Sequence, residues 1–336
     1  MTGATHSRPD VSVAMTICDG LPFLREQVVS MAEQELPWSQ LVIADDGSID
    51  GGAQVVTNRF GDRAQIISLA GGQGTNRAMA AALAEIDNPL VAMCDHDDVW
   101  YTNKLASLVR CFDDSRVMLA VSDARLINSA GEPMPSSLWQ RRRLTTRRSR
   151  QLTQDPLFTL LRSSLLTGAT MMFRRSLLEY VMPLPTEILP GHPAAEAHPM
   201  FIDRWISLVA AGVGAIALIP TPLMDYRVHE GQQTGPGSGR RFRLEAGEDV
   251  RLTRLVPQKD MTPALQAESQ QLRRLSERLD VVRATTIEDY RRTLEARAAL
   301  PVSRRSRTTP LARQAVTELR RGQGDGWRWA SDLLRR

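Results

Sequence analysis

Three carboxylates are crowded into one short stretch of this sequence, Asp95-His96-Asp97-Asp98, directly after the apolar residues Leu90–Cys94. The apolar run predicts a buried strand, so the aspartates fall at its carboxyl end. Like charges held this close repel one another unless a cation neutralises them. A hard divalent cation, Mg²⁺ or Mn²⁺, takes oxygen ligands and leaves positions open for phosphate oxygens. The motif therefore indicates a metal–diphosphate site, with a solvated acidic turn as the alternative.

The first 125 residues alternate expected strands with expected helices, and polar residues follow several of the strands. Further strands are predicted at Val11–Met15, Leu41–Ala44, Ile66–Leu69 and Val117–Val121, with helices near 76–86 and 103–112. This rhythm predicts an α/β fold with a mostly parallel sheet, in which ligands bind beyond the carboxyl ends of the strands. Asp19, Asp45-Asp46 and Gly72–Asn76 should lie at that edge, beside the acidic motif.

Two of these loops allow a ligand-binding role and a purely structural one. Asp46 ends the second expected strand, where a carboxylate can accept hydrogen bonds from a nucleotide base or ribose. An Asx turn or a helix N-cap is the alternative role. Gly72 and Gly74 permit close approach of a ligand to the backbone, or only a tight turn. The sequence contains neither the dinucleotide-binding glycine fingerprint after the first strand nor a Walker loop.

The composition excludes several classes of protein. The 336 residues are 42% hydrophobic, which fits a soluble globular protein. Three scattered cysteines are too few for a disulfide framework and favour a reducing compartment, and the short polar N-terminus predicts no signal peptide. The uncharged segment 206–224 contains glycines and prolines. It predicts a helix end and a short strand at 215–219 closed by proline, rather than a membrane span.

The net charge of +4 conceals a marked asymmetry along the chain. From Arg240 onward there are 22 basic and 13 acidic residues, whereas the rest has 20 and 25. A basic tail predicts an anionic partner, either a membrane surface or a nucleic acid. Nucleic acid is disfavoured because aromatic residues accompany the basic ones only in the last ten residues. Trp327 and Trp329 there fit an interfacial helix or an oligomerisation helix.

Two further segments shape the expected organisation of the chain. Between Trp139 and Gln151 six arginines and no acidic residue predict an exposed loop. That loop could bind the pyrophosphate of a lipid-linked acceptor or an anionic membrane, or be merely solvated. Gly231–Gly239 is the predicted linker. We therefore expect a domain at 1–235, with a nucleotide-binding half at 10–125 and an acceptor half at 126–235, and a basic helical extension at 240–336.

Taken in order, these motifs resemble glycosyltransferase family 2, and within it bacterial rhamnosyltransferase-like members that build surface polysaccharides. The resemblance covers about residues 11–235. It rests on 11–15 with Asp19-Gly20, Asp45-Asp46-Gly47-Ser48, Gly72…Asn76, the acidic motif with Val99-Trp100 and Asn103-Lys104-Leu105, Gly168-Ala169-Thr170-Met171, Asp203-Arg204-Trp205, Gly214, Pro222-Leu223, Tyr226-Arg227 and His229. It implies a GT-A fold and an enzyme that transfers a sugar with inversion at the anomeric carbon.

The resemblance also implies substrates and a cofactor. These are a dTDP- or UDP-linked sugar, with rhamnose as one candidate, Mg²⁺ or Mn²⁺, and a glycan or lipid-linked acceptor of the cell envelope. A cytoplasmic location follows, peripheral at the inner face of the membrane, and the C-terminal helices offer a route to oligomers. Asp203 would be the catalytic base, and Asp97, Asp98 and His229 would hold the metal. Nucleotide contacts would come from Thr16, Cys18, Asp19, Asp46, Gly72, Asn76, Asp95 and Arg227.

Several of these assignments keep an alternative. Asp203 could be a helix-surface charge paired with Arg204 or Arg174, His229 could be structural, and Arg227 could be an exposed arginine. Cys18 stands where the family usually has a tyrosine that stacks on the base, which leaves the donor open.

Two other functions remain open at this point. One is a glycosyltransferase-like scaffold that binds a nucleotide without turnover, motivated by the departure at Cys18. The other is a sugar-phosphate nucleotidyltransferase. It is disfavoured because the loop after the first strand, 16–21, contains an acidic residue and no basic one.

Overall fold

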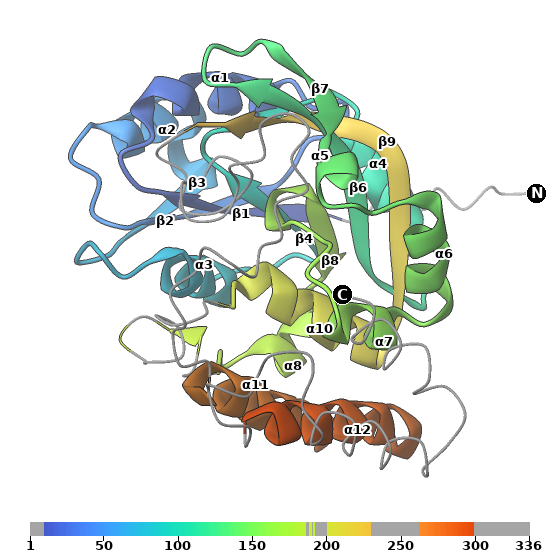
Figure 1. Ribbon diagram of the computed structural model, residues 1–336. Helices are drawn as coiled ribbons and strands as arrows, with labels where there is room; N and C mark the ends of the chain where they lie inside the picture. Colours follow the sequence, from blue (N-terminus) through green and yellow to red (C-terminus); the bar gives the residue numbers. More distant parts are fainter. Residues whose placement is uncertain (1–9, 186–187, 190, 192–199, 230–261, 299–336) are drawn as a thin grey trace, which may run out of the picture. The chain divides into compact units, whose positions relative to one another are not determined.

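The computed structural model describes residues 10–185, 188–189, 191, 200–229 and 262–298, which fall into two units (Figure 1). One unit comprises Met1–His192 with Met200–Val250, and the other comprises Pro193–Pro199 with Arg251–Arg336. The predicted linker at 231–239, the domain boundary beside it and the tryptophan-containing end at 327–336 lie outside the described residues. The predicted domain division therefore stays a prediction.

The first unit is built on one sheet, whose strands are β1 (Val11–Ile17), β2 (Gln40–Asp45), β3 (Ala64–Ser68), β4 (Leu90–Asp95), β5 (Val99–Trp100), β6 (Val117–Asn128), β7 (Pro133–Ser137), β8 (Met171–Arg174) and β9 (Ala215–Val228). Their order is β3-β2-β1-β4-β8-β6-β9-β5, with β7 paired to β6. Strands β1 to β4 are parallel, as predicted, and β6 is parallel to β9. Strand β8 runs antiparallel between β4 and β6, so the second half of the sheet is mixed.

Helices cover both faces of this sheet. They are α1 (Leu21–Ala32), α2 (Gly52–Phe60), α3 (Thr75–Ala84), α4 (Lys104–Val109), α5 (Leu138–Arg141), α6 (Thr146–Gln154), α7 (Pro156–Leu161), α8 (Leu178–Val181) and α10 (Ile202–Val213). In Figure 1, α1 and α2 lie on one side of β1–β4, and α3 and α10 lie on the other. Because strand side chains alternate between faces, Val13 and Met15 of β1 pack with Leu24 and Val28 of α1 in one core.

The pairing of the parallel strands brings the predicted site loops to one edge of the sheet. In the β1–β2 register Ile17 lies opposite Asp45, and in the β1–β4 register Thr16 lies opposite Asp95. All three strands therefore end together, which is where ligands bind in sheets of this kind. The sequence-based expectation that these loops lie side by side is confirmed.

Two expectations about local structure were wrong. Strand β9 does not end before Pro220 but continues through Pro220 and Pro222 to Val228. Its pairing with β6 shifts register next to these prolines, so the ladder does not need their missing N–H groups. The arginine-rich segment is not one loop but contains α5 and α6. Ser137 and Thr145 cap these helices by accepting hydrogen bonds from the N–H groups of Gln140 and Arg148.

The second unit contains α11 (Thr262–Ser276) and α12 (Val281–Ala298), which pack side by side (Figure 1). Leu272, Leu275, Ile287 and Leu294 are buried. Both helices fall within the stretch 240–336 that was expected to be helical. No helix of the described ranges combines the length and the apolar character needed to cross a membrane.

Candidate functional site

The acidic motif forms a cluster at the end of β4. Carboxylate oxygens of Asp95, Asp97 and Asp98 lie within 4.8 Å of one another. Burial, and then the charges of Asp97 and Asp203, raises the pKa of Asp95 to about 7. Burial, with its two acidic neighbours, also raises the pKa of Asp98. Such a cluster is stable as a set of carboxylates only when a cation shares it.

The cluster fits a divalent metal ion. Asp98 is completely buried, and its Oδ1 accepts a hydrogen bond of 3.0 Å from the backbone N–H of Arg227. Its Oδ2 is buried with no hydrogen-bond partner among the described residues. A buried carboxylate oxygen left without a partner is costly, and a hard cation that takes oxygen ligands would satisfy it.

His229 lies beside the cluster although it is far away in the sequence. It directly follows β9, and its Nε2 is 2.9 Å from Oδ2 of Asp97. The imidazole also packs against the ring of Phe23, with 4.8 Å between the ring centroids. The structure thus brings together all four of the residues Asp95, Asp97, Asp98 and His229.

Arg227 is not the exposed arginine considered as the alternative. Its side chain is buried, and the guanidinium packs 4.8 Å from the centre of the Phe23 ring. Nε donates to the carbonyl oxygen of Asp97 at 2.8 Å, and Nη2 donates to Oε2 of Glu26 at 2.5 Å. Nη1 lies within 3.5 Å of the carbonyl oxygens of Asn128 and Ser129. These contacts hold the guanidinium against α1 and the inner side of the acidic loop, and the nucleotide contact of Arg227 stays a prediction.

Asp46 fastens two loops together. Its Oδ1 and Oδ2 accept hydrogen bonds of 2.8 Å from the backbone N–H groups of Gln73 and Gly74. The two loops touch at glycines, because a Cβ on Gly47 would lie 2.6 Å from Cα of Gly71. In place of the Asx turn considered for Asp46, its neighbour Asp45 accepts a hydrogen bond of 2.8 Å at Oδ1 from the N–H of Ser48, three residues on.

Four other predicted nucleotide contacts lie at this edge. The carbonyl oxygen of Thr16 is 3.3 Å from Nδ1 of His96. Cys18 is exposed, and Asp19 has a positive φ of 47°. Gly72 also has a positive φ, 66°, in the loop that Asp46 holds. Because Cys18 is exposed at the edge of the sheet, a ligand can reach it. The side chain at this position offers no aromatic ring.

Asn76 does not face this edge. The residue is buried, and its Nδ2 donates to the carbonyl oxygens of Ile188 and Met200 at 2.6 and 2.9 Å. Its Oδ1 accepts from the N–H of Ile202 at 2.9 Å. Both amide hydrogens are therefore used within the protein, and Asn76 connects α3 to the start of α10. The predicted nucleotide contact of Asn76 is replaced by this structural role.

Asp203 lies in the first turn of α10, against the loop that precedes β8. Its Oδ1 accepts from the N–H of Arg204 at 2.6 Å, and its Oδ2 accepts from the N–H of Gly168 at 3.3 Å. Burial raises the pKa of Asp203, and the charge of Arg142 is the strongest influence opposing that rise. Arg174, the other arginine considered as its partner, donates instead to backbone carbonyl groups, including that of Val117. The geometry supports a partly buried carboxylate that faces the Gly168 loop.

Lys104 is a residue whose role the sequence did not indicate. It begins α4 and is fully buried, with Nζ 2.6 Å from the carbonyl oxygen of Ala169 and 3.0 Å from Sδ of Met224. Burial lowers its pKa to about 8, against the opposing charges of nearby acidic groups that include Asp98 and Asp95. A lysine at the start of a helix is usually solvated, so only the tertiary structure reveals this cation beneath the acidic cluster.

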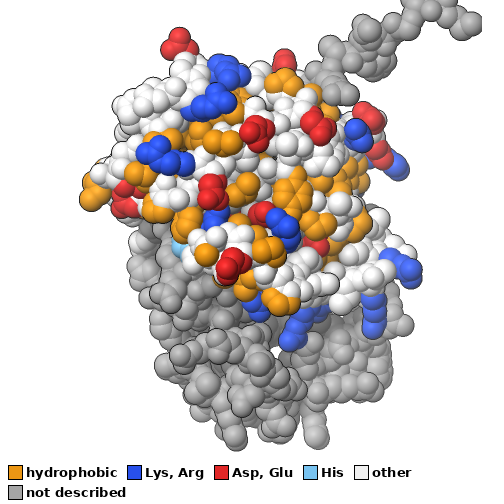
Figure 2. All heavy atoms as spheres, turned by 90° about the horizontal axis from the view of Figure 1, so that it is seen from above, with side chains coloured by type: hydrophobic (Ala, Val, Ile, Leu, Met, Phe, Trp, Pro, Cys, Tyr) orange, Lys and Arg blue, Asp and Glu red, His pale blue; other side chains and the backbone are white. Residues whose placement is uncertain are grey.

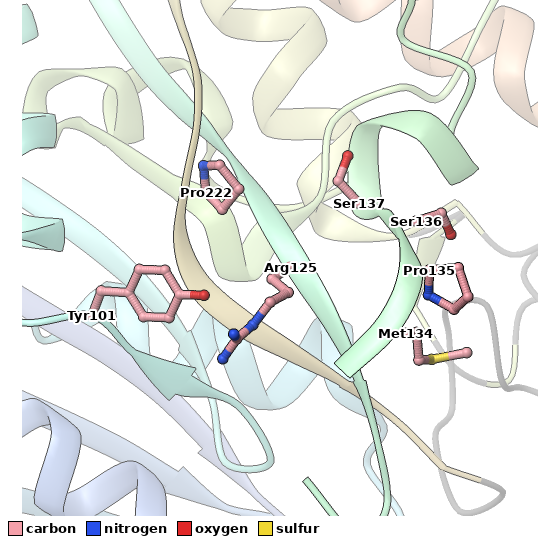
Figure 3. A pocket seen from close by; sticks show the side chains of 7 residues that line it. All are labelled: Tyr101, Arg125, Met134, Pro135, Ser136, Ser137 and Pro222. Atoms are coloured by element: carbon pink, nitrogen blue, oxygen red, sulfur yellow. The ribbon is translucent and has the colours of Figure 1, made fainter. Parts of the chain in front are cut away.

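An open pocket of about 340 Å³ lies elsewhere on the first unit (Figure 3). Its lining comprises Tyr101, Arg125, Met134, Pro135, Ser136, Ser137 and Pro222. Arg125 and the Tyr101 hydroxyl both donate to Asp225, at 2.6 and 2.7 Å. None of the predicted site residues lines this pocket, so the candidate site is defined by the strand-end loops.

Comparison with known proteins finds related sequences. An uncharacterized glycosyltransferase of Nostoc sp. is 26% identical over 227 residues, which is 65% of each chain. A putative teichuronic acid biosynthesis glycosyltransferase of Bacillus subtilis, TuaG, is 24% identical over 132 residues, 39% of this chain and 52% of the relative. The chain thus spans 65% and 52% of the lengths of these two relatives.

A solved structure shares the architecture. S. aureus TarS 1–349, in complex with UDP-GlcNAc, aligns with a TM-score of 0.53 at 16% identity, covering 85% of this chain and 91% of the TarS chain. The fold is therefore GT-A, as predicted. The model of glycosyl transferase family 2 matches residues 12–181, about half of the chain. The chain belongs to glycosyl transferase family 2.

Proposed function

We propose that this protein is an inverting, metal-dependent glycosyltransferase that moves a sugar from a nucleoside diphosphate to a hydroxyl group of a cell-envelope polysaccharide acceptor. The observation that carries this proposal is the cluster of Asp95, Asp97 and Asp98, with a buried unpartnered oxygen, next to a further, partly buried carboxylate, Asp203. The acidic cluster suits the binding of a metal-bound diphosphate, and Asp203 suits the removal of a proton from an acceptor. Family membership supports the reaction type, and the name of TuaG supports the acceptor class.

In this proposal Mg²⁺ or Mn²⁺ held by Asp97, Asp98 and His229 would offset the charge of the departing diphosphate as a Lewis acid. Arg227 keeps the loop of these ligands in place through the carbonyl of Asp97 and the carboxylate of Asp98. The nucleoside would be surrounded by Asp46, which holds the glycine loop, and by Thr16, Cys18, Asp19 and Gly72.

Asp203 would act as the catalytic base. As the acceptor oxygen attacks the anomeric carbon, its proton passes to the carboxylate of Asp203. The new carbon–oxygen bond forms while the bond to the diphosphate oxygen breaks on the opposite side, which inverts the anomeric configuration. The nucleoside diphosphate leaves with the bonding electrons, so no covalent enzyme intermediate is needed.

The choice of donor rests on the region around Cys18. We propose a UDP- or dTDP-linked sugar, with rhamnose among the candidates. We further propose that residues 1–235 form the catalytic domain and 240–336 a basic helical extension that meets an anionic partner or a second copy of the chain.

The decisive experiment measures nucleotide release from a panel of UDP- and dTDP-sugars, with Mn²⁺ or Mg²⁺ and with a chelator. The wild type should release nucleotide only with metal, and Asp97→Asn should lower the rate on the order of 10³-fold. Asp87→Asn, which changes an aspartate remote from the cluster, is the matched control. Equal turnover by Asp97→Asn would refute the metal assignment. Nucleotide binding without turnover of any donor would favour the scaffold function.

A further inference from the structure

The arginine-rich segment that forms α5 and α6 carries positive charge that the protein does not neutralise. Of its six arginines, Arg141, Arg143, Arg147 and Arg150 are exposed, and the other two are partly buried. Residues 139–151 contain no carboxylate, and none of the six arginines forms an ion pair with a described carboxylate. In Figure 2 basic side chains gather at the lower right border of the coloured surface, the side on which α6 lies in Figure 1.

Arg142 is a partly buried arginine of this segment, and one of its polar atoms is enclosed. Its backbone N–H donates to the carbonyl oxygens of Leu138 and Gln140, which fixes it at the end of α5. Its Nε is buried and has no hydrogen-bond partner among the described residues. A buried donor without a partner is costly, so such a group in a site marks a place for a ligand.

The surroundings of Arg142 are those of the proposed transfer reaction. Its charge acts on Asp203 more strongly than that of the adjacent Arg204, and it also acts on the buried Tyr226. The charges of the acidic cluster, in addition to burial, raise the pKa of Tyr226. The charge of Arg142 therefore acts on the proposed base and on a tyrosine that the acidic cluster also influences.

A second unpartnered polar group adjoins the same carboxylate. Thr167 is buried, and its Oγ1 has no hydrogen-bond partner among the described residues. The next residue, Gly168, donates its N–H to Asp203. A guanidinium and a hydroxyl next to one base offer the donors that a phosphate or carboxylate group requires.

We propose that the acceptor is an anionic glycan, and that Arg142 binds a phosphate or carboxylate group beside the hydroxyl that is glycosylated. The exposed arginines of α5 and α6 bind further anionic groups along the same glycan. This inference rests on the proposed function and deepens it by naming the acceptor class. A guanidinium suits this task because its planar fork matches both oxyanions bidentately.

An anionic glycan fits the segment better than a membrane surface does. A helix that lies in a membrane interface presents large apolar side chains to the lipid. In α5, in α6 and between them, Leu138, Trp139, Leu144 and Leu152 are all buried. A membrane would also leave the buried Nε of Arg142 without a partner.

The test uses the full chain and three fluorescent probes: an oligogalacturonide with carboxylates, a short polyphosphate, and a neutral maltooligosaccharide. Anisotropy should show binding of at least one anionic probe and none of the neutral one. Arg142→Gln should weaken that binding by about 10- to 100-fold, the range for hydrogen bonds to charged groups. Arg142→Lys keeps the charge without the planar fork of the guanidinium. Its affinity for the anionic probe should lie between those of the wild type and Arg142→Gln.

A matched control is Arg110→Gln, an exposed arginine outside the segment, which should bind the anionic probe like the wild type. The double variant Arg147→Gln with Arg150→Gln should weaken binding a few-fold and reduce its salt dependence. The two anionic probes separate a phosphate-bearing glycan from a carboxylate-bearing one.

Other results would overturn the inference without touching the proposed function. Nucleotide release from a donor sugar together with no binding of either anionic probe would do so. The same holds if Arg142→Gln weakens UDP binding measured by calorimetry and spares the glycan probe, because Arg142 would then serve the donor. Arginine-dependent binding to phosphatidylglycerol vesicles, with no binding of the anionic glycans, would assign the segment to a membrane.

Discussion

The two carboxylate regions of the site differ in the kind of polar atom that lacks a partner. Around Asp97 and Asp98, the backbone and side chain of Arg227 and the imidazole of His229 bind the loop from within. The buried atom without a partner there is an acceptor, Oδ2 of Asp98. Around Asp203, Nε of Arg142 and Oγ1 of Thr167 are buried without partners in the described structure. The first region is built in advance for a small, hard ion, and the second leaves donors available to a larger substrate. We therefore expect metal binding to depend on the residues that support the metal loop. Turnover at Asp203 should depend on the acceptor.

The largest expected effect separates the chemical roles of the two regions. Asp203→Asn removes the proposed base and should lower kcat by about 10²–10⁴-fold, with Mn²⁺ and UDP affinities unchanged. Steady-state kinetics and calorimetry on the same protein measure both. Loss of metal binding in this variant would show that the two regions are not independent.

The same residue predicts a pH dependence. Asp203 accepts a proton only when ionised, and burial raises its pKa above that of an exposed aspartate. The acidic limb of kcat should therefore lie at higher pH than an ordinary carboxyl group would give, with activity lost as pH falls through that pKa. The profile of Arg142→Gln should move further upward, because the charge of Arg142 holds this pKa down.

The second effect tests the support of the metal loop. Glu26→Gln removes the charge that pairs with the buried Arg227, and should weaken Mn²⁺ binding by about 10- to 100-fold. Glu33→Gln, an exposed change at the end of the same helix, is the control. Calorimetric titration of Mn²⁺ without nucleotide measures the effect. If metal-free UDP binding falls instead, Arg227 contacts the diphosphate after all.

A third effect concerns stability rather than binding. Asn76→Ala deletes three hydrogen bonds, two that join α3 to the start of α10 and one to the carbonyl oxygen of Ile188. Urea unfolding should show a loss of about 1–3 kcal/mol for a buried group left unpaired. UDP affinity of the folded variant should match the wild type. A selective loss of UDP affinity with unchanged stability would restore Asn76 to the donor site.

The smallest expected effect tests whether the nucleotide base lies next to Cys18. Cys18→Tyr supplies the aromatic ring that the family usually has, and should raise UDP affinity by about 0.5–1.5 kcal/mol through stacking on the base. Cys18→Ser should have no such effect. Unchanged affinity of the tyrosine variant would mean that the base lies away from Cys18.

Much of the fold was predictable because local patterns decide it. The apolar runs of β1, β2 and β4 and the polar residues after them predicted a parallel sheet with loops at one edge, which the register confirms. The arginine-rich segment was predicted wrongly. Its charges indicate exposure, but the buried Leu138, Leu144 and Leu152, together with two caps, make it helical.

The sequence by itself determined which residue types stand at the strand ends, and so it identified the acidic cluster and Asp46, whereas Asp203 was assigned from the family resemblance. Only the tertiary structure decided where Arg227, Asn76, Lys104 and Arg142 direct their polar atoms. Arg227 donates to Glu26, which is far away in the sequence, because α1 packs where β9 ends. Asn76 points into the interior because α10 begins beside α3. A side chain's direction depends on segments far away in sequence, and no local pattern contains that information.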